Sequence, residues 1–188
     1  MLRCDPTVLF AKWESRDSSS HHYYNQFANG KNDGSVGAHG AKGWPFYSPE
    51  EKNGWGMFQR DPTDGGIPVT IDQVWNWHTN VQVAVQQELV EKQTTATSYL
   101  QSVGSSPPTY TTGNGMIFSA KDTLTMERYN GANGRKNSQL LIYTPGNPPG
   151  VGIGKQWRWN LPNAPSKPGQ PPNPPYVDCV ASVMATSP

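Results

Sequence analysis

Three short segments carry residues suited to acid–base and hydrogen-bonding chemistry. Glu14 and Ser15 stand in "KWESR", residues 54–59 read "GWGMFQ", and residues 128–131 read "RYNG". A glutamate beside apolar side chains is partly desolvated, and desolvation raises the pKa of a carboxyl group. A carboxyl group that keeps its proton near neutral pH can act as a general acid. Glu14 is therefore the first candidate for a catalytic residue.

A short N-terminal helix is expected to position Glu14. Asp5 is a good N-cap, Pro6 suits the first helical position, and "TVLFAKWES" continues without a helix breaker. Phe10 precedes Glu14 by four residues, so the carboxyl group lies one turn further along, beside the apolar stripe. The helix thus supplies the apolar surroundings that a general acid needs.

A long helix is predicted from about residue 70 to residue 103. Thr70 and Gln73 match a capping box, and apolar residues recur at three- and four-residue steps from Ile71 to Leu89. "TTATS", residues 94–98, is a possible point of interruption, and Gly104 ends the pattern. A third helix is expected to begin at Ser119 and end at the Asn130–Gly131 pair.

The rest of the chain reads mainly as loops and extended segments. Residues 17–68 hold a glycine-rich stretch, "NGKNDGSVGAHGAKGW", that is typical of a β-hairpin. "LPNAPSKPGQPPNPP" is too rich in proline for a helix or a central strand, and "YVDCVASVMA" suits a short final helix. We predict a mainly α (α+β) fold with a long central helix and a small β-hairpin region. We expect one domain over residues 1–188, with residues 144–188 as a proline-rich tail over its surface.

Composition excludes several classes of protein. The 188 residues carry 15 Lys and Arg against 14 Asp and Glu, a net charge of +1, which argues against a nucleic-acid partner. No window resembles a membrane span, and the charged start lacks the apolar region of a signal peptide. Export would need another route, or the chain is a fragment of a larger protein. Cys4 and Cys179 are two separate thiols or, in an exported protein, one disulfide.

The three segments together resemble the lysozyme-like superfamily, in its branch of soluble lytic transglycosylases and goose-type lysozymes. That branch has a Glu-Ser pair ending a helix, a Gly-Leu-Met-Gln-like turn and an Ala-Tyr-Asn-Gly-like segment. The matching residues here are Glu14 and Ser15, residues 56–59, and residues 129–131. Residues 68–86, "PVTIDQVWNWHTNVQVAVQ", are also similar to the corresponding helix of bacterial effector muramidases. The resemblance covers residues 5–131. It departs from the pattern in a long insert after Glu14, in Phe58 and in Arg128.

The resemblance implies a lysozyme-like fold and an enzyme that cuts the glycan strands of peptidoglycan without a cofactor. Glu14 would protonate the glycosidic oxygen between N-acetylmuramic acid and N-acetylglucosamine. A hydrolase that inverts would also need a second carboxylate to place a water. Asp33 is the preferred residue, Asp61, Glu50 and Glu51 are rivals, and a solvated turn residue is the alternative interpretation of each.

Substrate binding is assigned to polar and aromatic residues around the same segments. Ser15, Gln59, Tyr129 and Asn130 fit by their position in the motifs. Trp157 and Trp159 fall on one side of an extended "QWRWN" segment, where they form either a stacking surface for sugars or an anchor for the tail. The four histidines (His21, His22, His39 and His78) lack the spacing of a zinc motif, so no metal is expected.

Three other functions stay open at this point. A lytic transglycosylase would close the muramic acid 6-hydroxyl onto C1 and give 1,6-anhydro products. A non-catalytic domain of the same fold would bind peptidoglycan or chitin without cleavage, and a chitinase or chitosanase would cut chitin oligomers. As a muramidase, the chain would act in the bacterial periplasm or cell wall, as a type VI secretion effector or a phage lysin. An effector would have secretion machinery and an immunity protein as partners.

Overall fold

The computed structural model places part of the chain in two compact units. It describes residues 47–48, 54–55, 58, 69–70, 72–73, 76–104, 106–130, 134–146, 156–164 and 173–183. One unit comprises residues 1–88 and the other residues 89–188, and each is described by itself. The expectation of a single domain stays a prediction, because units of this size can be parts of one domain.

The first unit combines a short hairpin with the start of a helix. Strands β1 (Tyr47–Ser48) and β2 (Gly54–Trp55) pair antiparallel, with Tyr47 opposite Trp55. Helix α3 (Trp77–Val83) begins after Asn76, whose side chain accepts the backbone N–H groups of His78 and Thr79. The π-helical segment η1 (Ala84–Leu89) follows α3 directly in the chain.

The predicted helix over residues 70–103 is confirmed at its end and wrong at its start, because the extended backbone of Asn76 interrupts it and α3 begins at Trp77. Thr70 and Gln73 form the predicted capping box, with each backbone N–H donating to the other residue's side-chain oxygen. Helix α4 (Val90–Val103) ends at Gly104, whose φ of 61° is left-handed. The expected break at residues 94–98 is wrong. The hydroxyls of Thr94 and Thr95 donate to the carbonyls of Val90 and Lys92, which lets these residues stay inside the helix.

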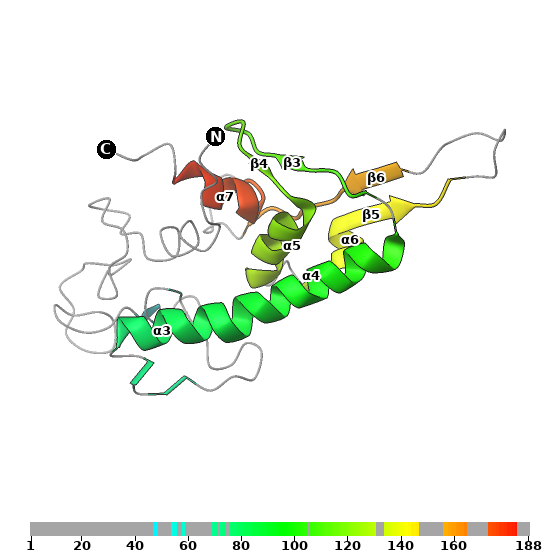
Figure 1. The fold of residues 1–188 in the computed structure, drawn as a ribbon. Coiled ribbons are helices and arrows are strands. Elements are labelled where there is room, and N and C mark those ends of the chain that lie inside the picture. The colour runs from blue at the N-terminus through cyan, green and yellow to red at the C-terminus, as the bar shows by residue number, and fades with distance from the viewer. Residues whose placement is uncertain are drawn as a thin grey trace. The chain divides into compact units, whose positions relative to one another are not determined.

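The second unit is built around helix α5 (Ala120–Tyr129). Its other elements are α4, β3 (Tyr110–Thr111), β4 (Ile117–Phe118), α6 (Asn137–Leu140), β5 (Leu141–Thr144), β6 (Gln156–Trp159) and α7 (Tyr176–Ser182). α5 packs against α4 and against α7, and Figure 1 shows it between them. The core residues include Ala96 from α4, Leu124 from α5, and Leu140 and Leu141 from the α6–β5 junction.

α5 begins and ends where the sequence predicts. The Ser119 hydroxyl accepts the Asp122 N–H at 3.1 Å, and Asn130 is the C-cap. Six of its ten residues are buried, among them Thr123 and Thr125. The hydroxyls of these two threonines donate to carbonyls four residues earlier, so their burial leaves no donor unpaired. α5 is more buried than the longer α4, in which only Ala96 is fully buried.

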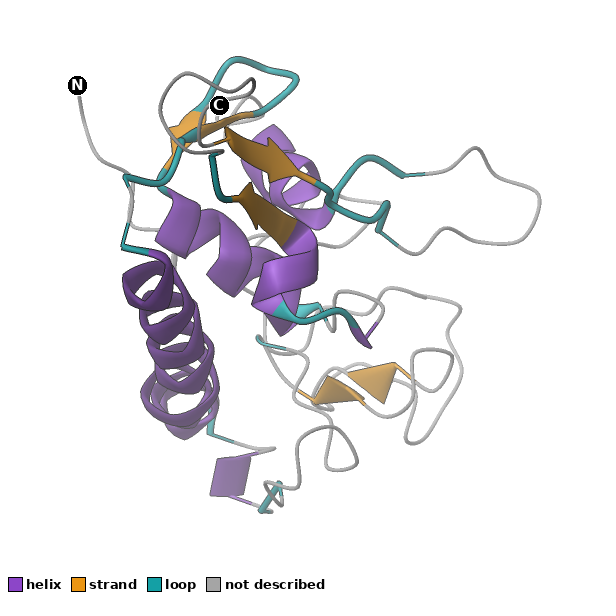
Figure 2. Cartoon of the chain, turned by 90° about the vertical axis from the view of Figure 1, so that its right-hand side faces the viewer, coloured by secondary structure: helices purple, strands orange, loops and turns teal. Residues whose placement is uncertain are grey.

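Two hairpins and a final helix complete this unit. β3 pairs antiparallel with β4. β5 pairs antiparallel with β6, with Leu141 opposite Trp159 and Thr144 opposite Gln156. Both pairs are visible as strands in Figure 2. α7 buries Val177, Cys179 and Val180, so it contributes to the core. The helices and small antiparallel sheets confirm the α+β class, and α7 confirms the predicted final helix.

Candidate functional site

The predicted site residues fall into two groups. Three of them lie in the second unit: Tyr129 and Asn130 at the end of α5, and Trp157 on β6. The others lie outside the described residues, namely Glu14, Ser15, Asp33 and Gln59, together with the rivals Glu50, Glu51 and Asp61. The N-terminal helix and the glycine-rich hairpin also lie outside them, as does Cys4, so a bridge to Cys179 stays untested.

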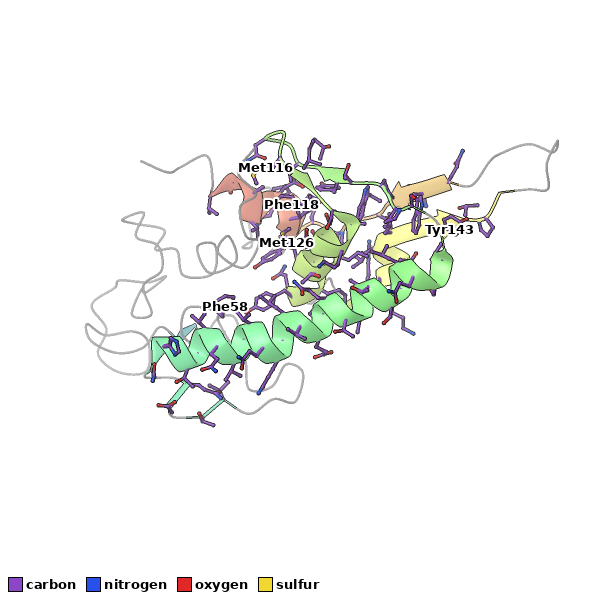
Figure 3. The ribbon with its side chains drawn as sticks, in the orientation of Figure 1. Phe58, Met116, Phe118, Met126 and Tyr143 are labelled. Atoms are coloured by element: carbon purple, nitrogen blue, oxygen red, sulfur yellow. The ribbon has the colours of Figure 1, made fainter. Side chains whose placement is uncertain are left out.

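Phe58, in the "GWGMFQ" segment, is anchored beside α3. It lies in a turn, is fully buried, and its N–H donates to the Asn80 side-chain oxygen at 3.4 Å. Asn80 is itself fully buried, one turn into α3. Figure 3 marks Phe58. The backbone of Phe58 thus ties this turn to α3, and its side chain is fully buried.

Arg128 and Tyr129 are the last two residues of α5, and Asn130 is its C-cap. The Asn130 N–H donates to the Met126 carbonyl at 3.4 Å, and both Tyr129 and Asn130 are partly buried. Arg128 extends to the next segment, where its Nη1 donates to the Arg135 carbonyl at 2.6 Å. Arg128 therefore ties Arg135 to the end of α5.

Glu127 is a buried carboxyl group that the sequence interpretation missed. Its side chain is 1% exposed, and one carboxylate oxygen accepts the Val177 N–H at 3.0 Å. Burial raises its pKa from 4.5 to about 7, the negative charge of Asp178 adds to the rise, and the N–H groups of Val177 and Tyr176 oppose it. Glu127 stands three residues after the buried Leu124, so the helical period was the signal that could have revealed it.

Asp178 joins α7 to the β3–β4 hairpin. Its two oxygens accept the Tyr110 hydroxyl at 2.6 Å and the Gly113 N–H at 2.7 Å. Burial, followed by this hydrogen bond and the charges of Asp178 and Glu127, raises the pKa of Tyr110. The Asn114 amide also donates to the Ala181 carbonyl at 3.0 Å. α7 is thus held at its start by Glu127 and along its length by the hairpin.

The Glu127 carboxyl group is placed to hold α7 rather than to meet a substrate. A proton donor must come within hydrogen-bonding reach of the group that it protonates. Glu127 is covered, and one of its oxygens already accepts a backbone N–H of α7. Its raised pKa follows from burial in a structural role, which is a common origin of perturbed values outside catalytic sites.

Trp157 and Trp159 lie on the same side of β6, as expected, and both pack on the core cluster. Trp157 contacts the Tyr143 ring at 4.8 Å and the Tyr99 ring at 6.5 Å between centroids. Trp159 donates its indole N–H to the Thr109 carbonyl at 3.2 Å. This packing is the one expected of an anchor for the tail. The substrate-binding role of Trp157 stays a prediction.

The described part of the chain contains no group of three His, Cys, Asp or Glu side chains that could hold a metal ion. Of the predicted histidines, His78 lies on α3 and is exposed, while His21, His22 and His39 fall outside this part. Nor is any helix within the described residues long and apolar enough to cross a membrane.

Comparison with known proteins gives no assignment. No family model, curated protein or solved structure matches the chain.

Proposed function

We propose that this chain is a peptidoglycan-degrading muramidase with a lysozyme-like fold and that Glu14 is its general acid. The observation that carries the proposal is the order of three motif segments along the chain: "ES", "GMFQ" and "YNG". Each segment is short and common by itself. The proposal therefore depends on the order of the segments and on the helices and turns that contain them.

The local structure at two of these segments supports the proposal. Phe58, in the second segment, is fully buried and lies in a turn fixed to α3 through Asn80. Tyr129 and Asn130 stand at the end of α5, a helix with six of its ten residues buried. Residues that bind a substrate are best supported by rigid elements of this kind.

In the proposed reaction, the Glu14 carboxyl group gives its proton to the glycosidic oxygen as the bond to C1 of N-acetylmuramic acid breaks. In hydrolysis, a water attacks C1 and Asp33 takes one of its protons. In the transglycosylase alternative, the muramic acid 6-hydroxyl attacks C1 and its proton returns to Glu14. The two routes differ in their products by one water.

Mass spectrometry of the fragments released from purified sacculi tests this proposal. Wild type is expected to release muropeptides, and Glu14→Gln is expected to reduce the rate by at least about a hundredfold, because general acid catalysis contributes that much. Glu91→Gln, an exposed glutamate on α4, is the matched control and should keep full activity. Full activity in a folded Glu14→Gln variant would refute the assignment.

The same spectra separate the alternatives. A reducing-end muramic acid that carries the added water indicates a hydrolase, and Asp33→Asn should then slow its release. A 1,6-anhydro product indicates a transglycosylase, for which Asp33→Asn should have no effect. Binding to sacculi with no release by wild type would favour a binding domain, and release from chitin oligomers alone would favour a chitinase.

The proposed substrate places the site of action in the bacterial periplasm or cell wall. An antibacterial effector domain and a phage lysin both fit this location. For an effector, the proposal includes an immunity protein and secretion machinery as partners.

A further inference from the structure

Two carboxyl groups attach helix α7 to the second unit. Glu127, in the last turn of α5, accepts the Val177 N–H at 3.0 Å. Asp178, in the first turn of α7, accepts the Tyr110 hydroxyl at 2.6 Å and the Gly113 N–H at 2.7 Å. α7 also packs against α5, as Figure 1 shows. The position of α7 therefore depends on two groups that can each carry a negative charge.

The Glu127 carboxyl group is buried at the contact with α7. Its side chain is 1% exposed, and Val177, which donates to it, is fully buried. Five of the seven residues of α7 are buried, among them Cys179 and Val180. Because a Glu127 oxygen is bonded to the α7 backbone, it gains water on this side only when α7 moves away. Keeping an ionised carboxylate in such a place is costly.

The groups that face Glu127 from other elements bring no positive charge. From α7, the N–H groups of Val177 and Tyr176 donate to it, and Asp178 carries a charge of the same sign. From the β3–β4 hairpin, Tyr110 faces both carboxyl groups, because burial and then their two charges raise its pKa. Like charges repel each other strongly away from water. Ionisation of Glu127 is thus opposed by burial and by Asp178.

The charged groups of the other elements around Glu127 are engaged elsewhere or exposed. On α5, Arg128 donates to a backbone carbonyl at 2.6 Å. On α4, Glu91 lies 3.6 Å from Lys92. Lys136, the N-cap of α6, is exposed. Within the described residues, Glu127 therefore has no cation with which to pair.

The segment before α7 has an attachment of its own. The Ala164 N–H donates to the Pro174 carbonyl at 3.0 Å, and Asn163 forms an antiparallel β-bridge with Pro175. Neither contact uses Glu127 or a residue of α7. The chain up to Pro175 can thus stay in place while α7 leaves α5 and the hairpin, which makes Pro175 the hinge.

We propose that α7 is a pH-sensitive switch, in which deprotonation of Glu127 releases Tyr176–Ser182 from α5 and from the β3–β4 hairpin. Protonation of Glu127 docks the helix again. The inference is independent of the proposed function.

The direction of the switch follows from the two states of Glu127. Burial raises its pKa to about 7 when α7 is docked, and the ordinary value of 4.5 returns when the released helix admits water. The docked state thus holds the proton more tightly. Its advantage is fully present below about pH 4.5 and is lost as the pH rises through about 7. A released helix of seven residues does not keep its hydrogen bonds in water, so its amides exchange.

Hydrogen exchange followed by mass spectrometry at pH 6 and pH 8 tests the inference on the whole chain. Protection factors are compared, since these remove the direct effect of pH on chemical exchange. In wild type, the protection of Tyr176–Ser182 should fall about tenfold between the two values, because the shift of the Glu127 pKa changes the opening equilibrium by that factor. In Glu127→Gln it should fall less than about twofold. Glu91→Gln, an exposed glutamate on α4, is the matched control and should follow wild type.

A second measurement on wild type separates release of α7 from unfolding of the whole unit. At pH 8, α7 should be protected at least about tenfold less than the buried middle of α5, Thr123–Met126. Up to about 1 M urea should leave the protection of α7 unchanged and lower that of α5, because a local opening exposes little surface. Equal protection of α7 and α5 with the same urea dependence would overturn the inference. So would a fall between pH 6 and pH 8 that Glu127→Gln shares in full.

Discussion

Glu127 is charged above neutral pH only at a cost in stability. Its carboxyl group is buried between α5 and α7, and the N–H groups of α7 replace only part of the lost water. Because the folded pKa of about 7 lies above the ordinary 4.5, the folded state binds this proton more tightly between those values. This contribution to stability is thus fully present below about pH 4.5 and is lost as the pH rises to about 7.

Glu127→Gln should remove this pH dependence. Glutamine stays neutral and keeps an oxygen that can accept the Val177 N–H. The variant should therefore be more stable than wild type above pH 7, by about 3 kcal/mol when the full pKa shift of Glu127 contributes to stability. Denaturant unfolding at pH 5 and pH 8, followed by tryptophan fluorescence, gives the difference. Glu91→Gln should follow wild type at both values. Parallel curves for Glu127→Gln and wild type would contradict the prediction.

Tyr110 offers a second test at the residue scale. Its hydroxyl donates to Asp178 at 2.6 Å in a partly buried setting, and Tyr110→Phe leaves that carboxylate with one fewer donor. We expect a loss of about 1–2 kcal/mol in the free energy of unfolding. Tyr143→Phe is the control, since the Tyr143 hydroxyl makes no hydrogen bond within the described residues, and it should change stability by less than about 0.5 kcal/mol. Equal losses in both variants would refute a role for the Tyr110–Asp178 bond.

At the scale of elements, α5 is the helix on which the second unit depends. Leu124 is fully buried at its middle, whereas Ile117, just before α5, is 58% exposed. Leu124→Ala should lower the free energy of unfolding by about 2–5 kcal/mol, because it removes buried methyl groups and leaves a cavity. Ile117→Ala should cost less than about 1 kcal/mol. Thermal unfolding of the two variants compares them, and similar losses would mean that α5 is not the core helix.

Local signals predicted the helix ends well. Ser119 caps the start of α5, Asn130 caps its end, and Gly104 ends α4 in a left-handed conformation. Each role depends only on neighbouring residues, so the sequence predicts it. The hairpins β3–β4 and β5–β6 were not predicted. β3 and β4 have two residues each, too few to show an alternating pattern, and β5 is separated from β6 by residues 145–155. "TTATS" has weak helix propensity, but hydroxyl bonds to the preceding turn keep it helical.

The chemistry of the candidate site stays a prediction, and its geometry could not be predicted from the sequence. The motif order names Glu14, Gln59 and Asn130 as residue types suited to glycan cleavage, while their mutual placement depends on tertiary contacts that no short segment specifies. Glu127 shows the converse. It belongs to no motif, and its raised pKa arises because α7, fifty residues later, covers it.

For the whole molecule, the distribution of charge matters more than its sum. A net charge of +1 argued against a nucleic-acid partner, yet the second unit carries +4, from eight Lys and Arg against four Asp and Glu, and its Glu127 and Asp178 carboxylates accept hydrogen bonds within the unit. Coulombic attraction over a surface is screened within about 10 Å at 0.1 M salt, so a partner responds to the nearest charges rather than to the total.

Hydrogen bonds connect Arg128 to Arg135 and Arg135 to the Asn160 carbonyl, and Lys136 and Arg158 stand one and two residues from these positions. We call these four cations the basic surface and expect them to dominate adsorption to an anionic support.

Cation-exchange chromatography at pH 7 checks this expectation without reference to catalysis. Replacing two lysines or arginines by glutamate changes the net charge by −4, so a double variant of this kind carries −3. Lys92→Glu/Lys121→Glu should still be retained at about 0.1 M salt, because its basic surface is intact and more distant charges are screened. Lys136→Glu/Arg158→Glu should pass through the column, since the contact itself has been reversed. Co-elution of the two variants would mean that net charge alone governs adsorption, and the basic surface would then have no separate role.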